Sequence, residues 1–183
     1  MIALPSAELV TELTQLLYYE ASLLDVGLYE EWLDLLHEDV AYVAPIREDV
    51  AGQRAAQPSQ EKHALTFFND NLGSLRMRVA KIRTGLSQTE IPSSRVVRLV
   101  SNIQVGQPTD AGDHAVRSAF LIYRQHRQRQ VEMLAGHRRD RWRRGPQGWR
   151  LAYREVAFAA NVLPVKSLPL FYLDRGRQRL IER

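Results

Sequence analysis

The chain has 183 residues, 45% of them apolar and 25% charged, a balance that predicts one soluble globular domain over residues 1–183 with a substantial core. It contains no cysteine, which excludes disulfides, thiolate nucleophiles, cysteine-ligated zinc and cysteine-ligated iron–sulfur clusters. The formal charge of +4 is a weak signal for an anionic partner, and no apolar run approaches the roughly 20 residues of a membrane span, so we expect a cytoplasmic protein with no membrane partner.

Residues 20–45 carry the clearest local signals in the chain. A helix is predicted from Ser6, whose hydroxyl can cap it, to about Leu24, and Gly27 suits the left-handed conformation that closes a helix. A short second helix should follow, because four apolar residues recur at helical spacing: Tyr29, Trp32, Leu33 and Leu36. Residues 40–45 then have the composition of a buried strand that the proline ends.

A loop and a third helix are predicted in the next part of the chain. Residues 46–63 are polar and show no sustained period, which is typical of a surface loop. A helix can begin after a cap at Asn69 or Asp70, and it should end near Gly85. Its buried stripe is formed by five apolar residues: Leu72, Leu75, Val79, Ile82 and Leu86.

Beyond Arg95 the period shortens to two, which predicts strands. Turn signals divide this part into four strands: 95–105, 115–125, one within 131–144, and 149–163. The last two strands are joined by the turn Gly145-Pro146-Gln147-Gly148. Such a succession is an antiparallel meander.

Together these elements predict an α+β cone. Its sheet is strongly curved and mixed or antiparallel, with the N-terminal helices and the third helix packed on the concave face. The order of elements resembles the NTF2-like, or cystatin-like, cone superfamily. Because that architecture hosts both enzymes and structural subunits, the fold alone does not decide the function.

Five segments narrow the resemblance. They are LLDVGLYEEWLDLLHEDVAYVAPIR, LRMRVAKIRTG, PSSRVVRLVSNIQV, GHRRDRWRR with GWRLAYREV, and VLPVKSLPLFY. In this order and with similar gaps they resemble the small (β) subunit of aromatic-ring-hydroxylating dioxygenases, over about residues 9–172. The residues that carry the first and third motifs are Trp32, Asp39, Tyr42, Pro45, Arg95, Val100, Ser101 and Asn102. Residues 174–183 continue past the family's usual end, as a frayed tail or a short docking helix.

The resemblance implies a non-catalytic subunit of an oxygenase. In that family the large α subunit carries a Rieske [2Fe-2S] cluster and a mononuclear Fe(II), and the β subunit forms a trimer that holds an α3β3 assembly together. Electrons from NAD(P)H reach the α subunit through a reductase system, so a ferredoxin or reductase would be only an indirect partner. The arene is chosen mainly in the α subunit. The missing cysteines agree independently, because a Rieske cluster requires two of them.

Catalysis by this chain itself is the competing hypothesis. Cone-fold isomerases, dehydratases and cyclases move protons with carboxylates and tyrosines, so Asp39 and Tyr42 are the candidate acid and base of a stand-alone enzyme acting on a small hydrophobic substrate. A structural role is favoured for both residues. The five histidines are scattered without a close pair, so no metal or cofactor site is predicted in this chain. A cone-fold binding module unrelated to oxygenases is a third reading.

The candidate residues for subunit contacts are aromatic, apolar, polar or charged. Alternation along a strand should divide the arginines at 138–144 between opposite faces, which disfavours a nucleic-acid stripe. Asp140 and Glu155 are expected to pair with neighbouring arginines, and Arg95, Arg98 and Arg154 to bridge to another subunit. A solvated strand edge is an equal alternative for each of them. Pro164 and Pro169 keep the apolar segment 162–173 out of a helix, so it should pack on this chain or on a copy of it. The predicted interface residues are Trp32, Arg95, Arg98, Asn102, Arg138, Asp140, Arg154, Leu168 and Phe171. Of these, Trp32 is expected as either a core or an interface anchor.

Overall fold

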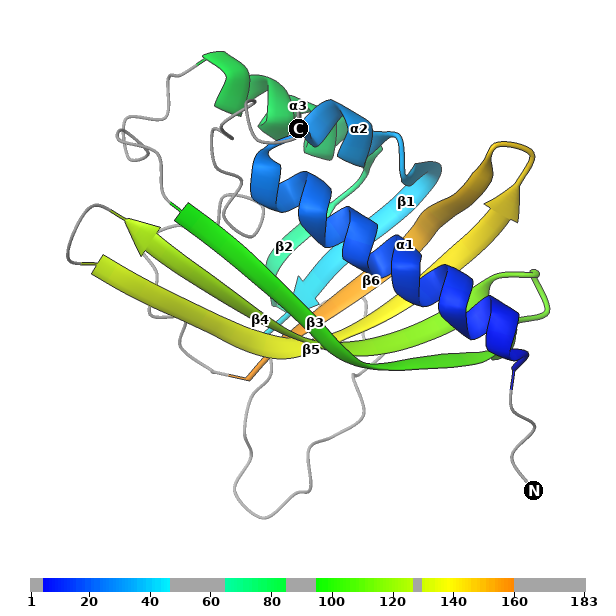
Figure 1. The fold of residues 1–183 in the computed structure, drawn as a ribbon. Coiled ribbons are helices and arrows are strands. Elements are labelled where there is room, and N and C mark those ends of the chain that lie inside the picture. Colours follow the sequence, from blue (N-terminus) through cyan, green and yellow to red (C-terminus); the bar gives the residue numbers. More distant parts are fainter. Residues whose placement is uncertain (1–4, 47–64, 85–94, 127–129, 160–183) are drawn as a thin grey trace, which may run out of the picture.

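The computed structural model describes residues 5–46, 65–84, 95–126 and 130–159 (Figure 1). The helices and strands of these residues follow in chain order: α1 (Ala7–Val26), α2 (Tyr29–Leu33), β1 (Leu36–Pro45), β2 (Thr66–Asp70), α3 (Leu72–Thr84), β3 (Arg95–Pro108), β4 (His114–His126), β5 (Gln130–Gly145) and β6 (Gly148–Phe158). The predicted loop at 46–63 and the segment 162–173 lie almost wholly or wholly outside the described residues.

The ends of α1 are closed as the sequence predicts. The Ser6 hydroxyl accepts a hydrogen bond from the backbone N–H of Leu9 at 3.2 Å. Gly27 adopts the left-handed conformation, with φ of 79°, and its N–H donates to the carbonyl of Leu23. The helix therefore extends to Val26, slightly beyond the predicted end.

The second helix is shorter than predicted, and the strand after it is longer. Leu36 was expected on the helix but begins β1, where it pairs with Leu151 of β6. The backbone N–H of Leu151 also donates to the carbonyl of Leu35 at 2.8 Å. Pairing with a distant strand thus overrides the local helical spacing.

The start of α3 differs in detail from the prediction. Asn71 caps the helix: its side-chain oxygen accepts from the N–H of Ser74 at 2.9 Å, and the Ser74 hydroxyl accepts from the N–H of Asn71 at 2.9 Å. Asp70 instead ends the short strand β2, which was not predicted, and binds Arg78. Leu75, Val79 and Ile82 form the buried stripe as expected.

The sheet is mixed and has the strand order β2-β1-β6-β5-β4-β3. β3 to β6 form the predicted antiparallel meander, β1 runs parallel to β6, and β2 pairs antiparallel with β1. The sheet bends strongly around α1, and the three helices lie on its concave face (Figure 1). The α+β cone is therefore confirmed. None of the described helices is long and apolar enough to cross a membrane.

The core lies between the helices and the concave face of the sheet. Its members include eight apolar side chains that expose no more than 1% of their surface: Leu13, Leu17, Trp32, Leu75, Val79, Trp142, Leu151 and Val156. Burial of such side chains supplies most of the driving force for the fold. Charged side chains are also buried between the helices and the sheet, and they form an ionic cluster.

Candidate functional site

A buried ionic cluster occupies the inside of the cone. Glu20 lies on α1, Asp140 on β5 and Arg154 on β6, and each exposes no more than 2% of its surface. Glu20 continues the stripe of Leu13 and Leu17 on α1, so it must face the sheet. Asp140 and Arg154 are register partners on adjacent strands, so their side chains share one face.

Arg154 holds the cluster together through both of its acidic partners. Its Nε and Nη2 donate to Oδ1 and Oδ2 of Asp140 at 2.8 and 2.7 Å. Its Nη1 donates to Oε1 of Glu20, and its Nη2 donates to Oε2 of Glu20 at 2.8 Å. The guanidinium group therefore makes two forked pairs at once, an arrangement that its planar donors favour.

Two further side chains complete the cluster. The indole N–H of Trp32 donates to Oε1 of Glu20 at 3.2 Å. Arg138, two residues before Asp140 on the same face of β5, donates from Nε to the Ser118 hydroxyl at 3.2 Å and from Nη1 to Glu20 at 3.4 Å. Two arginines thus face two carboxylates, and the buried charge is balanced.

The cluster shifts the pKa values of its members in different directions. Burial alone would raise the pKa of Glu20, but Arg154, Arg138 and the hydrogen bonds to the carboxylate outweigh burial and hold this pKa below its ordinary value. Burial would lower the pKa of Arg154, but Asp140 and Glu20 raise it well above the ordinary value. Glu20 and Arg154 therefore keep their charges at neutral pH.

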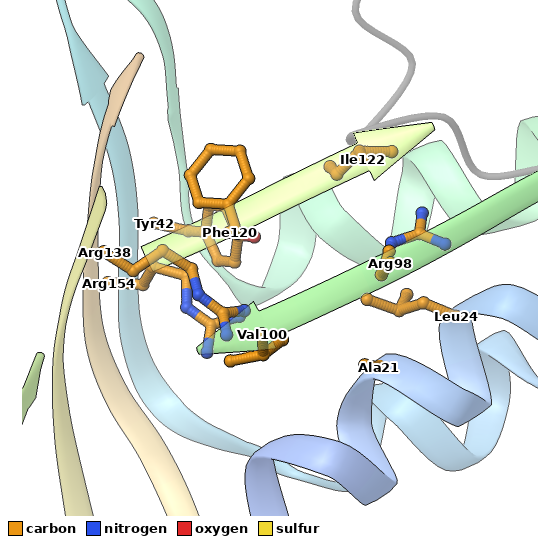
Figure 2. A pocket seen from close by; sticks show the side chains of 9 residues that line it. All are labelled: Ala21, Leu24, Tyr42, Arg98, Val100, Phe120, Ile122, Arg138 and Arg154. Carbon is orange, nitrogen blue, oxygen red and sulfur yellow. The ribbon is translucent and has the colours of Figure 1, made fainter. Parts of the chain in front are cut away.

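A small cavity of about 30 Å³ lies beside the cluster. Figure 2 shows Arg138 and Arg154 together at one end of this cavity, and Arg98 with Leu24 at the other. The remaining lining residues are mostly apolar: Ala21, Tyr42, Val100, Phe120 and Ile122. One water molecule needs about 10–15 Å³ of such space, so the cavity is of a size for a few water molecules.

Tyr42 is a wall of this cavity and not an accessible acid. It is 3% exposed, and the Arg154 guanidinium carbon lies 5.5 Å from the centroid of its ring. Burial raises the pKa of the Tyr42 hydroxyl. Asp39, its predicted catalytic companion, does not line the cavity, and its side chain is 83% exposed. The structure therefore does not bring the two residues together.

Arg98 binds a partner within this chain, and its side chain is largely buried. Its guanidinium group binds Oδ1 of Asp25, and its backbone N–H donates to Oδ2 of the same carboxylate at 3.0 Å. Asp25 lies in the last turn of α1, and Arg98 lies on β3 at the edge of the sheet. This contact fastens the helix to the edge strand and occupies one of the backbone donors there.

A second ion pair stands at the far end of β5. Arg143 donates from Nε and Nη2 to the two oxygens of Asp113 at 2.7 and 3.1 Å, and its Nη1 lies 3.4 Å from Nε2 of His37. The hydrogen bond from Arg143 lowers the pKa of Asp113 below its ordinary value.

Among the described residues, no three His, Cys, Asp or Glu side chains converge as a metal site would require.

The predicted interface residues divide by burial. Trp32, Asp140 and Arg154 are interior residues of this chain. Arg138 and Arg98 are largely enclosed by the internal partners described above. Arg95 and Asn102 are exposed on β3, where Asn102 has a φ of 53° at an irregularity of the β3–β4 pairing. Leu168 and Phe171 lie outside the described residues.

Comparison with known proteins identifies the relatives of this chain. The family described as ring hydroxylating beta subunit matches residues 19–165. The chain belongs to this family. The biphenyl 2,3-dioxygenase subunit beta of Rhodococcus jostii (strain RHA1) is 33% identical over 163 residues, which cover 88% of this chain and 87% of that subunit.

Solved structures give the same result for the fold. A naphthalene 1,2-dioxygenase structure with indole bound superposes with a TM-score of 0.79 and 27% identity, covering 90% of this chain and 86% of the other. A second structure is an NTF2-like protein with a cystatin-like fold from Novosphingobium aromaticivorans, which is 16% identical with a TM-score of 0.54. The match covers 83% of this chain and 82% of that protein, and it supports the fold alone. The ring-hydroxylating β subunit is thus built on the NTF2-like cone.

Proposed function

We propose that this β subunit is a non-catalytic component of an aromatic-ring dioxygenase, and that it assembles as a trimer with three large α subunits into an α3β3 complex. The proposal draws on relatives that are named as β subunits of biphenyl and benzene dioxygenases. Its role in such a complex is to give the α subunits a fixed platform.

The observation that carries the proposal is the filled interior of the cone. Small-molecule sites usually enclose about 300–1,000 Å³. Here the place where a cone-fold enzyme would bind its substrate contains the Glu20–Arg154–Asp140 cluster, with a cavity of about 30 Å³ beside it. Each acidic oxygen of the cluster already accepts a hydrogen bond from arginine, so neither carboxylate is poised to take a proton from a substrate.

The redox chemistry of the proposed complex belongs to the partner subunit. A Rieske cluster needs two cysteine and two histidine ligands, and this chain has no cysteine. We therefore assign the [2Fe-2S] cluster and the mononuclear Fe(II) to the α subunit. Electrons from NAD(P)H would enter there, and a ferredoxin or reductase would have no need to contact the β subunit.

The stand-alone isomerase, dehydratase or cyclase is the weaker alternative. It requires an acid and a base in one cavity, but the exposed Asp39 does not line the cavity that Tyr42 borders. The family membership also favours the dioxygenase.

The test is to co-express this chain with the large subunit encoded beside it, and to assay arene oxidation by the purified complex supplied with its electron donors. The β subunit alone should show no turnover, and Tyr42→Phe in the complex should leave the turnover unchanged. Loss of a true general acid would instead reduce the rate by about 100-fold or more. Such a loss with unchanged complex mass, or turnover of a substrate by the isolated chain, would overturn the proposal.

A further inference from the structure

The small cavity beside the ionic cluster is lined by three arginines. Arg138 and Arg154 lie at one end of it and Arg98 at the other (Figure 2). Their carboxylate partners are Glu20, Asp140 and Asp25. None of these three lines the cavity, and the lining formed by the described residues contains no other aspartate or glutamate. The cavity therefore faces the positive side of each ion pair.

One nitrogen of Arg138 still has a hydrogen bond to give. Its Nε donates to the Ser118 hydroxyl at 3.2 Å, and its Nη1 donates to Glu20 at 3.4 Å. Its Nη2 is buried and has no hydrogen-bond partner within the part of the chain that the structure describes. A buried donor of this kind is costly, and Arg138 lines the cavity, so an acceptor placed there would satisfy it.

The charge of Arg138 is also compensated less completely than that of Arg154. Oε2 of Glu20 lies 2.8 Å from Nη2 of Arg154 but 3.4 Å from Nη1 of Arg138. Burial and the neighbouring Arg154 lower the pKa of Arg138 below its ordinary value, whereas the pKa of Arg154 is raised. A negative charge beside Arg138 would therefore be stabilised.

The ion pair at the other end of the cavity adds to this positive field. The Arg98 side chain is only 6% exposed, whereas the side chain of its partner Asp25 is 24% exposed. Water screens a partly exposed charge more strongly than a buried one. The charge of Arg98 is therefore only partly offset inside the cavity, although the buried cluster itself is formally neutral.

The lining suits an anion better than a water molecule. Arginine side chains only donate hydrogen bonds, and the Tyr42 hydroxyl is the one side-chain acceptor among the described residues of the lining. A water molecule needs acceptors for its own two hydrogens, whereas a halide ion only accepts. Burial raises the pKa of Tyr42, so its hydroxyl keeps a proton to donate. A halide ion is only slightly larger than water, so it fits a cavity of about 30 Å³.

We propose that this cavity binds one halide ion, such as chloride, through Nη2 of Arg138 and beside Arg154 and Tyr42. The ion supplies the acceptor that Arg138 lacks, and it stabilises the packing of α1 against the sheet. This binding does not depend on the proposed function, and the ion takes no part in the chemistry of the complex.

The direct test is a crystal of the full chain grown with sodium bromide, with anomalous scattering measured at the bromine absorption edge. We expect an anomalous peak in the cavity, within hydrogen-bond distance of Nη2 of Arg138. Bromide bound only at exposed side chains, as an adventitious ion only, would overturn the proposal. Water density in the cavity without an anomalous peak would overturn it as well.

Melting temperatures provide a second arm in solution. When chloride replaces gluconate at constant ionic strength, the melting temperature of the wild type should rise with the logarithm of the chloride concentration, because the ion binds the folded chain alone. Gluconate is much too large for the cavity. Val100→Ile adds one carbon atom to the cavity wall and should abolish the rise. An equal rise in both proteins would reveal a general salt effect and overturn the site.

Arg138→Lys tests the named donor, because it keeps the charge and removes Nη2. The chloride concentration needed for a given rise should increase about tenfold or more. The matched control is Arg144→Lys on the same strand, where the side chain is 66% exposed, and its chloride dependence should equal that of the wild type. Circular dichroism checks folding. An unchanged dependence in folded Arg138→Lys would exclude Arg138 as the donor; should this variant fail to fold, the bromide peak and Val100→Ile decide.

Discussion

Arg154 and Glu20 are 134 residues apart in the sequence, yet two nitrogens of the arginine donate to the two carboxylate oxygens, Nη2 to Oε2 at 2.8 Å. One residue lies on the first helix and the other on the last described strand. Because Trp32 also binds Glu20 and Asp140 also binds Arg154, this pair fixes α1, α2, β5 and β6 relative to one another. The cone is thus held at its centre by charge as well as by apolar packing.

Glu20→Gln should strongly destabilise the chain, because it leaves Arg154 and Arg138 buried with less compensating charge. Breaking a buried pair on one side costs about 3–5 kcal/mol. The free energy of unfolding from urea denaturation of the purified chain measures the effect. The matched control is Glu12→Gln, which removes a partly exposed pair with Arg144 and should cost no more than about 1 kcal/mol. Equal effects of the two variants would show that the cluster contributes little to stability.

Stability should fall in acid because of the same carboxylate. The pKa of Glu20 is held below its ordinary value of 4.5 in the folded chain, so the unfolded chain binds the proton first as the pH falls. The stabilisation is therefore complete above about pH 4.5 and is lost as the pH falls through the folded pKa. Asp113 contributes in the same direction. Melting temperatures of wild type, Glu20→Gln and Asp113→Asn across this range check the prediction: each variant should lose less on acidification, and identical slopes would contradict it.

Asp25→Ala should loosen the edge of the sheet. The Asp25 carboxylate accepts both the backbone N–H and the guanidinium group of Arg98, and hydrogen bonds to a charged group contribute about 1.5–3 kcal/mol. Hydrogen exchange read by mass spectrometry should show faster exchange in the peptide that contains Arg98, with little change in β5. Asp34→Ala, at an exposed position on the α2 side, serves as the control. Unchanged protection of β3 would rule out the proposed role of Asp25.

Gly136→Ala should be destabilising although the change is small. A Cβ at this position would lie 2.3 Å from the Ala157 carbonyl oxygen and 2.9 Å from Cζ of Phe120, so β5 and β6 would have to separate. Overpacking of this kind costs about 1–3 kcal/mol. At Gly145 the nearest atom to a Cβ would be 3.7 Å away, so Gly145→Ala should leave the melting temperature almost unchanged. The melting temperatures of the two variants test this prediction. A Gly136→Ala variant as stable as the wild type would show that position 136 has room for a Cβ between β5 and β6.

Local features of the fold could be predicted from the sequence because their causes are local. Gly27 ends α1 through its own left-handed conformation, and the arginines of β5 divide between faces through strand alternation alone. Leu36 could not be assigned correctly, because it pairs with Leu151 more than a hundred residues away. β2 was missed for a similar reason: it has only five residues and exists through its pairing with β1.

The central residue of the site was also missed. Glu20 was not singled out, although it follows Leu13 and Leu17 at helical spacing and thus occupies a position of the apolar stripe. A charged residue at such a position signals a buried partner. The identity of that partner depended on which strand crosses the helix, which no local pattern contains. Asp140 was expected to pair with a neighbouring arginine, and it pairs with Arg154. Arg154 was expected to reach another subunit, but the structure buries it.

We propose that this chain is a structural subunit whose iron-bearing partner performs the chemistry. The most direct measurement is the iron content and visible absorbance of the chain purified alone, and of the complex purified after co-expression with the large subunit. We expect a colourless, iron-free oligomer in the first case and a brown complex with the mass of α3β3 in the second. Stoichiometric iron in the isolated chain, or a chain that does not bind the large subunit, would contradict it.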